Sequence, residues 1–377
     1  MNLRHLRFMA ALFATALLGF AADPLLPDTS APPTLPGMKL VWDEEFDISG
    51  KPDPAVWSYE QGFVRNQELQ WYQSDNANVG GGELVIEGVK QQVANPNYSA
   101  GSSDWKLNRQ YAQYTSASIT TSGHKTWQYG HAVVRARIDA QPGTWPAIWT
   151  VGSTGEWPTG GEVDLMEFYP MGGAPTLHAN VAWGSATEWV ANWSSQTRTL
   201  ASFIAKDPDW VKKFHIWTMD WNKDTVRLSL DSTVMNTTPT SKTVNSDGTD
   251  PFKDRSEYII LNLAIGANGG DPSGATFPMK YEVDYVRVYQ PTSTGILERA
   301  DREPVIRQIP GSHLIAVQVP LGDRGDRLDL FSLLGDRILS RIADGGVVQI
   351  DPGALAPGIY LVRLSTPRGA QTAKILR

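Results

Sequence analysis

The sequence contains no cysteine among its 377 residues. This absence excludes disulfide bonds, thiolate metal sites and a cysteine nucleophile. Positive charge is also in deficit, because 33 basic residues face 40 acidic ones and the formal net charge is −7. A chain this acidic is poorly suited to the phosphate backbone of DNA or RNA, so we expect no nucleic-acid partner.

Long hydrophobic runs are missing apart from one short stretch near the N-terminus. Residues 8–18 are predominantly apolar, basic residues precede them, and small residues follow through Ala22. This is the pattern of a secretory signal peptide, and the run is too short to span a bilayer. The alternative is a buried N-terminal helix. We expect residues 1–22 to direct export, and the product to be a secreted monomer, extracellular or at the cell surface, without stable membrane insertion.

The length predicts two domains, and the composition changes along the chain. All 14 tryptophans lie at or before Trp221. We predict a proline-rich extended leader over 23–37, a main domain over 38–291, a linker over 292–304 and a small β-sandwich over 305–377. In the main domain, short segments rich in β-branched residues are separated by Gly, Pro, Asn and Asp, with almost no helical periodicity. That pattern predicts an all-β sandwich.

Three acidic residues interrupt an otherwise apolar strand at 160–170, which reads GGEVDLMEFYP. Side chains two apart share one face of a strand, so Glu162 and Asp164 point together. Glu167 would point the other way unless one extra residue, a β-bulge at Leu165–Met166, restores the alternation. With that bulge, three carboxyl groups share one surface.

Crowded carboxyl groups raise each other's pKa, which is how one group can stay protonated as a general acid. Two carboxyl groups flanking a glycosidic bond are the usual apparatus of sugar hydrolysis. A solvated strand face or a cation site is the alternative. Three tryptophans, Trp145, Trp149 and Trp157, come just before these acids in the sequence. Indoles stack on sugar rings, so the combination favours a sugar-binding cleft over core packing alone.

The segments LVWDEEF, NQELQWY, GTWPAIW, GGEVDLMEF and YEVDYVRVYQ, in this order, resemble glycoside hydrolase family 16 over most of residues 40–290. The resemblance implies a β-jelly roll, concanavalin-like, with a substrate cleft on its concave face, and hydrolysis with retention of configuration. It implies that Glu162 is the nucleophile, that Glu167 is the acid/base, and that Asp164 tunes both. No cofactor is implied for catalysis.

The bulged spacing of the acids is similar to the laminarinase-like members. The resemblance therefore implies a secreted, retaining endo-β-1,3-glucanase that hydrolyses laminarin-type β-glucans by double displacement. A mixed-linkage β-1,3-1,4-glucanase or another family 16 polysaccharide hydrolase is the alternative. A non-catalytic β-glucan-binding protein is the alternative from another class, although all three acids are present.

Further residues follow from the resemblance by position. The residues expected to line the substrate cleft are Asn66, Arg135, Trp145, Trp149, Trp157, His178 and Asn262. The resemblance also implies a structural calcium ion on the convex face, bound by a backbone oxygen at Glu45, the carbonyl of Gly82 and the side chain of Asp284.

The C-terminal segment contains a strand–LLG–turn hairpin, a PGIYLVRL strand and Lys374 near its end. It resembles the sorting domain read by the type IX secretion system, which implies secretion machinery as a partner. A carbohydrate-binding module is the alternative. The lack of tryptophan and the single tyrosine, Tyr360, argue against that alternative.

Overall fold

The computed structural model describes residues 23–292, 305–308, 315–319, 326–333, 335–343, 346–350, 355–356, 359–366 and 369–376. The chain forms two compact units that divide between Pro291 and Thr292. The expected export signal at 1–22 and nearly all of the expected linker lie outside the described residues. Within the described residues, no helix has both the length and the apolar character needed to cross a membrane.

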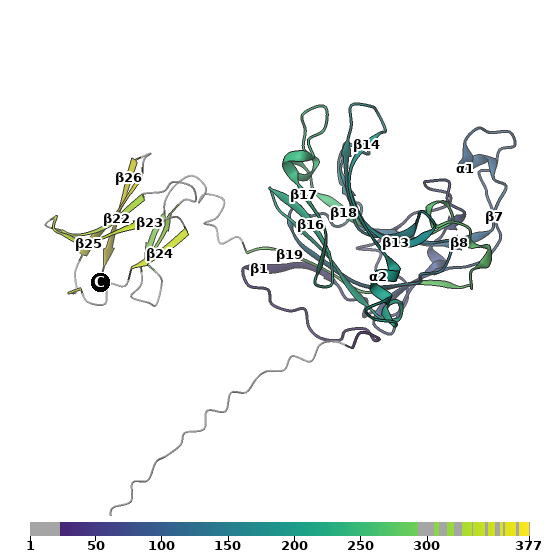
Figure 1. The fold of residues 1–377 in the computed structure, drawn as a ribbon, viewed down its shortest axis with the longest axis horizontal. Coiled ribbons are helices and arrows are strands. Elements are labelled where there is room, and N and C mark those ends of the chain that lie inside the picture. Colours follow the sequence, from purple (N-terminus) through teal and green to yellow (C-terminus); the bar gives the residue numbers. More distant parts are fainter. Residues whose placement is uncertain are drawn as a thin grey trace, which may run out of the picture. The chain divides into compact units, whose positions relative to one another are not determined.

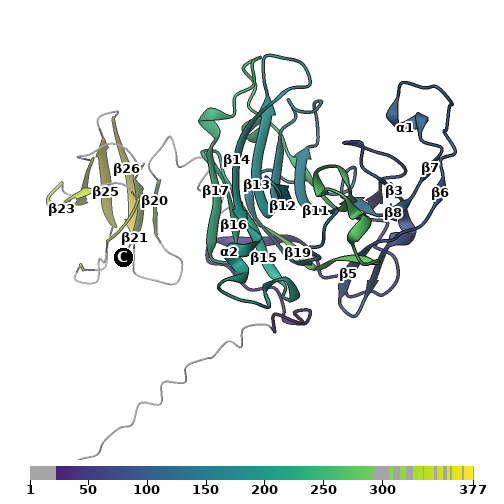
Figure 2. The same ribbon diagram turned by 45° about the vertical axis from the view of Figure 1, so that its right-hand side comes forward.

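The first unit is a sandwich of two antiparallel sheets (Figure 1). The outer sheet contains, in spatial order, β17 (Thr233–Pro239), β16 (Thr225–Leu230), β15 (His215–Trp221), β10 (Gly130–Ile138), β19 (Met279–Pro291), β5 (Glu83–Gly88) and β4 (Ala77–Gly80), and β1 (Met38–Glu44) pairs with β19. The cleft sheet contains β14 (Ala191–Thr199), β13 (Ala174–Gly184), β12 (Glu162–Met171), β11 (Thr144–Gly152), β18 (Glu257–Ile265), β9 (Ser118–Thr120) and β2 (Ser58–Tyr59). Figure 2 shows β11 to β14 side by side. The predicted all-β jelly-roll sandwich is confirmed.

Alternating side chains build the core between the two sheets. In β10, Val134, Ala136 and Ile138 point inward and are buried. In β11 and β18, Ile148 and Leu261 do the same from the cleft sheet, where the opposite face of the same strands forms the site. Complete burial of each large apolar side chain contributes roughly 1.5–3 kcal/mol. The two-residue period thus fixes which face of each strand is available for binding.

The connections carry the remaining short elements. They are β3 (Gln70–Tyr72), which pairs in parallel with β8 (Tyr114–Ser116), the pair β6 (Val93–Ala94) and β7 (Tyr111–Ala112), the helices α1 (Trp105–Asn108), α2 (Leu200–Ile204) and α3 (Pro251–Asp254), and the 3₁₀ turns η1 (Ser74–Asn76), η2 (Trp210–Lys212), η3 (Thr240–Lys242), η4 (Ala267–Gly269) and η5 (Pro272–Gly274). The excursion with α1 projects from the sandwich in both views (Figure 1, Figure 2).

The first part of the proline-rich leader is bound to the outer sheet. The carbonyl of Pro24 accepts a hydrogen bond from the Phe214 amide at 2.7 Å. Arg135 donates to the carbonyls of Asp23 (2.7 Å) and Leu26 (2.9 Å). The start of the leader is a turn, in which the Leu26 amide donates to the Asp23 carbonyl at 3.3 Å, and the main domain holds this turn in place.

The second unit has two antiparallel sheets of its own. One contains β20 (Val305–Gln308), β21 (Ile315–Val319) and β24 (Gly346–Ile350). The other contains β23 (Arg337–Ala343), β22 (Asp326–Ser332), β25 (Ile359–Thr366) and β26 (Gly369–Leu376). Leu328, Leu330, Val362 and Leu364 are buried in this second sheet.

Candidate active site

The three acidic side chains lie together on β12 because the strand has an irregular register. Asp164 pairs with Asn180 of β13, whereas Glu167 pairs with His178, so three steps along β12 match two along β13. The extra residue is the predicted β-bulge at Leu165 and Met166, which are both buried in the core. The bulge turns Glu167 to the face that Glu162 and Asp164 occupy, and all three line one cleft.

The three carboxyl groups differ in pKa because their surroundings differ. Burial, followed by the charges of Glu167 and Glu162, raises the pKa of Asp164 well above its ordinary value. Burial and the nearby Glu162 raise the pKa of Glu167 to about 7. Burial also raises the pKa of Glu162, but hydrogen bonds from Trp157 and Asp164 oppose the shift. The hydrogen bond between Asp164 and Glu162 raises the pKa of Asp164 and lowers that of Glu162, so it favours the proton on Asp164, while Glu167 can give or take a proton near neutral pH.

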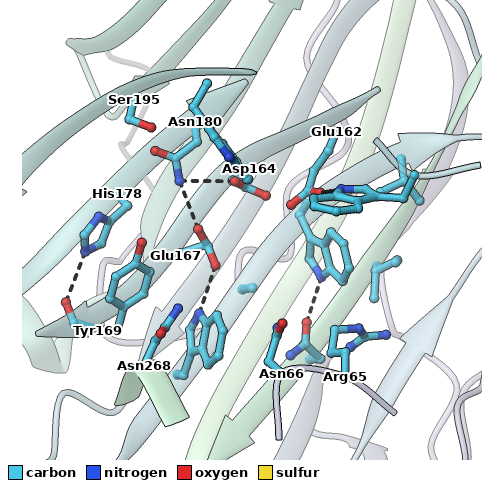
Figure 3. A pocket seen from close by; sticks show the side chains of 18 of the residues that line it. Arg65, Asn66, Glu162, Asp164, Glu167, Tyr169, His178, Asn180, Ser195 and Asn268 are labelled. Atoms are coloured by element: carbon cyan, nitrogen blue, oxygen red, sulfur yellow. Dashed lines mark hydrogen bonds between the residues drawn. The ribbon is translucent and has the colours of Figure 1, made fainter. Parts of the chain in front are cut away.

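Each of the three carboxyl groups accepts a hydrogen bond from a neighbouring side chain (Figure 3). The indole of Trp145 donates to Glu167 at 2.9 Å, and the indole of Trp157 donates to Glu162. Asn180 of β13 donates to Glu167 at 2.9 Å and to Asp164 at 3.1 Å. These donors fix the orientation of the carboxyl groups before any ligand is present.

The acids stand in the middle of a cleft with a volume of about 1250 Å³. On one flank the cleft is bounded by Arg65, Asn66 and Glu68, from the segment before β3. On the other flank, residues of β13 and β14 line it. Figure 3 shows Arg65 and Asn66 on one side of the acids and Ser195 of β14 on the other. A long polymer can therefore lie across the strands of the cleft sheet, with the acids under its middle.

Polar contacts order the flank near Arg65. The Arg65 guanidinium pairs with Glu60 and lies 5.0 Å from the centre of the Trp149 ring. The indole of Trp149 donates to Asn262 at 2.7 Å, so one cleft residue holds another. Asn66 has a positive φ of 54°, which an asparagine tolerates better than most residues, and its side chain reaches Glu68 at 3.3 Å.

Six of the seven expected cleft residues line the cleft, namely Asn66, Trp145, Trp149, Trp157, His178 and Asn262. Their contacts differ, however. Trp157 is 41% exposed and leaves ring surface for a ligand, whereas Trp145 is only 6% exposed. Trp145 therefore holds Glu167 more than it offers a stacking platform.

His178 is a buried neighbour of the acid row. Its ring stacks on Tyr169, with centroids 3.7 Å apart, and its Nε2 donates to the Tyr169 carbonyl at 3.1 Å. Burial lowers the pKa of His178. The imidazole is therefore neutral at pH 7 and adds no positive charge beside Glu167.

The expectation that Arg135 lines the cleft is wrong. Arg135 lies on β10 in the outer sheet, where its side chain points away from the core and is buried beneath the leader. Its guanidinium forms an ion pair with Asp284 at 2.5 Å. The resemblance assigned Arg135 to the cleft by its position in the sequence, but β10 pairs with β15 and β19 in the outer sheet.

Among the residues expected to hold calcium, Asp284 has no free carboxylate for a cation. The carboxylate of Asp284 already faces the Arg135 guanidinium and also accepts from the amide of Asp28 at 3.1 Å. The carboxylate of Glu45 pairs with Arg287 at 2.7 Å, and Pro27 of the leader packs beside Gly82. In the part of the chain that the structure describes, no three acidic or histidine side chains gather as a metal site. The one side chain expected to bind the ion, that of Asp284, is therefore already paired with Arg135 and the leader.

Several cleft residues were not anticipated from the sequence, namely Glu60, Arg65, Glu68, Tyr169, Asn180, Trp189 and Trp193. One signal was available, because Asn180 follows His178 by two residues and so shares its face of the strand. Trp189 and Trp193 carried no comparable signal, since their place depends on how β14 pairs with β13.

The chain is similar to proteins of known family. The model of "Glycosyl hydrolases family 16" matches residues 87–287. A beta-glucanase of Rhodothermus marinus is 33% identical over 68% of this chain and 86% of its own length. The glucan endo-1,3-beta-glucosidase A1 of Niallia circulans is 29% identical over 70% of this chain but only 39% of its own length. The catalytic domain of an endo-1,3-beta-glucanase (laminarinase) of Thermotoga petrophila has a TM-score of 0.56 at 29% identity, covering 68% of this chain and 98% of that domain.

Proposed function

The chain belongs to glycosyl hydrolase family 16 and is a glycoside hydrolase, and from this we propose that it is a retaining endo-β-1,3-glucanase acting on laminarin-type β-glucans. The observation that carries the proposal is the bulged β12 strand, which presents Glu162, Asp164 and Glu167 to one open cleft. Two carboxyl groups and water are the only reactants that the reaction needs besides the glucan.

In the first step, the Glu162 carboxylate attacks the anomeric carbon of the bound sugar. A bond forms between that carbon and a Glu162 oxygen, and the glycosidic carbon–oxygen bond breaks. Glu167 gives its proton to the leaving oxygen and becomes a carboxylate. A pKa of about 7 suits this task, because it leaves the proton available near neutral pH.

In the second step, the Glu167 carboxylate takes a proton from water as the water attacks the same carbon. The bond to Glu162 breaks, the sugar is released with its original configuration, and Glu167 is protonated again. Asp164 keeps its proton throughout and donates to Glu162, which steadies the nucleophile. The Trp157 indole also donates a hydrogen bond to the Glu162 carboxylate.

Two features support internal cleavage of a β-1,3-linked chain. The cleft has binding surface on both flanks of the acids, which suits a polymer that continues in both directions. The names of the Niallia and Thermotoga proteins specify endo-1,3-β-glucan cleavage. A mixed-linkage β-1,3-1,4-glucan is the second candidate substrate, since the name of the Rhodothermus protein specifies no linkage. The presence of all three acids speaks against a protein that only binds glucan.

We also propose that the protein is exported through residues 1–22 and acts outside the cell or at its surface as a monomer. The composition and hairpin motifs of residues 305–377 support a sorting domain that the secretion machinery recognises. Fusion of residues 1–22 to a reporter tests export. Deletion of 305–377 from the secreted protein tests sorting, and unchanged surface delivery after that deletion would rule it out.

The substrate is tested by reducing-sugar release from laminarin, lichenan, barley β-glucan and agarose by the purified protein. We expect the highest rate on laminarin. The highest rate on lichenan would keep the mechanism and change the substrate to a mixed-linkage glucan. Binding of laminarin without hydrolysis of any of the four would instead identify a glucan-binding protein.

A further inference from the structure

Two tryptophans with no role assigned so far, Trp189 and Trp193, lie at the β14 flank of the cleft. Trp189 lies in the turn between β13 and β14, and Trp193 lies on β14 itself. Their side chains are 56% and 47% exposed, and both line the same cleft as the acids. Without a ligand, exposed indoles keep a large apolar surface in contact with water. The pair therefore points to a ligand that covers it.

The strand register places Trp193 level with the nucleophile. Glu162 pairs with Ala182 of β13, and Ala182 pairs with Trp193 of β14. Neighbouring strands are about 4.8 Å apart, so two steps put the Trp193 backbone roughly 10 Å from that of Glu162. This exceeds the reach of the sugar bonded to Glu162. Trp193 therefore faces a more distant sugar of the same chain, on the flank opposite Arg65 and Asn66.

The backbone at Trp189 gives independent support. Trp189 has a positive φ of 61°, a conformation that bulky residues rarely adopt and that costs on the order of 1 kcal/mol or more. The amide of Val190 donates to the Thr187 carbonyl at 3.1 Å, and that of Ser185 to the Val190 carbonyl at 3.0 Å, so the turn is ordered around this residue. An asparagine or glycine would fit the turn with less strain. The structure keeps an exposed indole there instead, pointing into the cleft.

Resting on the proposed function, we propose that Trp189 and Trp193 form a sugar-stacking platform for the part of the β-glucan chain beyond the reacting sugar on the β14 flank. The apolar faces of pyranose rings pack on indole faces, and Ser195 and Thr197, which alternate with Trp193 on β14, offer hydroxyl groups to the sugar edges. The platform makes cleavage efficiency depend on chain length. It does not take part in bond making or breaking.

The test compares kcat/KM on β-1,3-gluco-oligosaccharides of increasing length. Trp193→Ala removes one ring, and Trp189→Asn removes the other while keeping a residue that accepts the positive φ. We expect the double variant to lose about tenfold in kcat/KM on long chains and little on the shortest cleaved chain. The single variant Trp193→Phe keeps an aromatic ring and should therefore retain most of the wild-type kcat/KM on long chains. The control is Tyr98→Ala, since Tyr98 is 40% exposed outside the cleft and its removal should change nothing.

The outcomes separate the platform from the proposed function. If the wild-type protein hydrolyses β-1,3-glucan and the double variant, with an unchanged melting temperature, shows the same chain-length dependence, the platform is wrong and the enzyme assignment stands. If the wild-type protein hydrolyses none of the glucans, the enzyme assignment and the glucan platform both fail. An equal loss on every chain length would show a general disturbance of the site and would also overturn the platform.

Discussion

Glu257 should make the stability of the protein depend on pH, separately from the active site. Its side chain is 0% exposed in the core beneath the cleft sheet. One carboxyl oxygen accepts from the Thr150 hydroxyl at 2.5 Å, and the other has no hydrogen-bond partner among the described residues. Burial, opposed in part by this hydrogen bond, raises the pKa of Glu257 from 4.5 to about 7, and the charge of Glu162 adds to the rise.

The size of the effect follows from the shift. The folded chain holds the Glu257 proton up to about pH 7, whereas the unfolded chain releases it near 4.5. The stabilisation is fully present below pH 4.5 and is lost as the pH rises through 7. A difference of about 2.5 pKa units at 1.36 kcal/mol each amounts to about 3 kcal/mol.

Glu257→Gln removes this titration while it keeps the shape and an acceptor for Thr150. Chemical denaturation of the wild-type protein and the variant, measured between pH 4.5 and 8, gives the difference in unfolding free energy. We expect that difference to shift in favour of the variant by about 3 kcal/mol across the range. The exposed Glu156→Gln is the matched control and should follow the wild type. Parallel pH curves for the wild type and Glu257→Gln would refute the reasoning.

Three further predictions concern the site and the leader. Because only protonated Glu167 can act as the acid, kcat/KM should fall as the pH rises through about 7, and a profile still rising past pH 9 would contradict this. Asn180→Ala removes a hydrogen-bond donor that lowers the pKa of Glu167. The fall of kcat/KM at alkaline pH should therefore move to higher pH, and kcat should drop about tenfold or more. A fall of kcat/KM at lower pH than in the wild type would contradict this role. Arg135→Met leaves the buried Asp284 without its ion-pair partner and releases the leader. It should therefore lower the free energy of unfolding by about 3 kcal/mol and leave the KM on laminarin unchanged. A large rise in KM would show that Arg135 contacts the substrate after all.

The sequence predicted those parts of the site that depend on one strand. The acids at 162, 164 and 167 share a face only with a bulge, and that parity argument identified Leu165–Met166 correctly. It could not identify partners that other strands supply. Asn180 reaches two of the acids because β13 pairs with β12 in one register, and a single sequence does not specify that register.

The errors have the same origin. Arg135 and Asp284 both lie on the outer sheet, where they bind each other and the leader. The resemblance assigned each of them by position, Arg135 to the sugar cleft and Asp284 to calcium. Their mutual contact is a long-range pairing across 149 positions of sequence. Residue type and strand period carry no information about such a pairing.

The central claim is that Glu162 forms a covalent bond to the sugar during hydrolysis. The direct measurement is intact-protein mass spectrometry of the enzyme incubated with a slowly turned-over 2-fluoro β-glucoside that carries a good leaving group, followed by peptide mapping. We expect a single glycosyl adduct on the peptide at Glu162, and no adduct in the Glu162→Gln variant. An adduct located on Glu167 or Asp164, or rapid hydrolysis of laminarin by Glu162→Gln, would contradict the account.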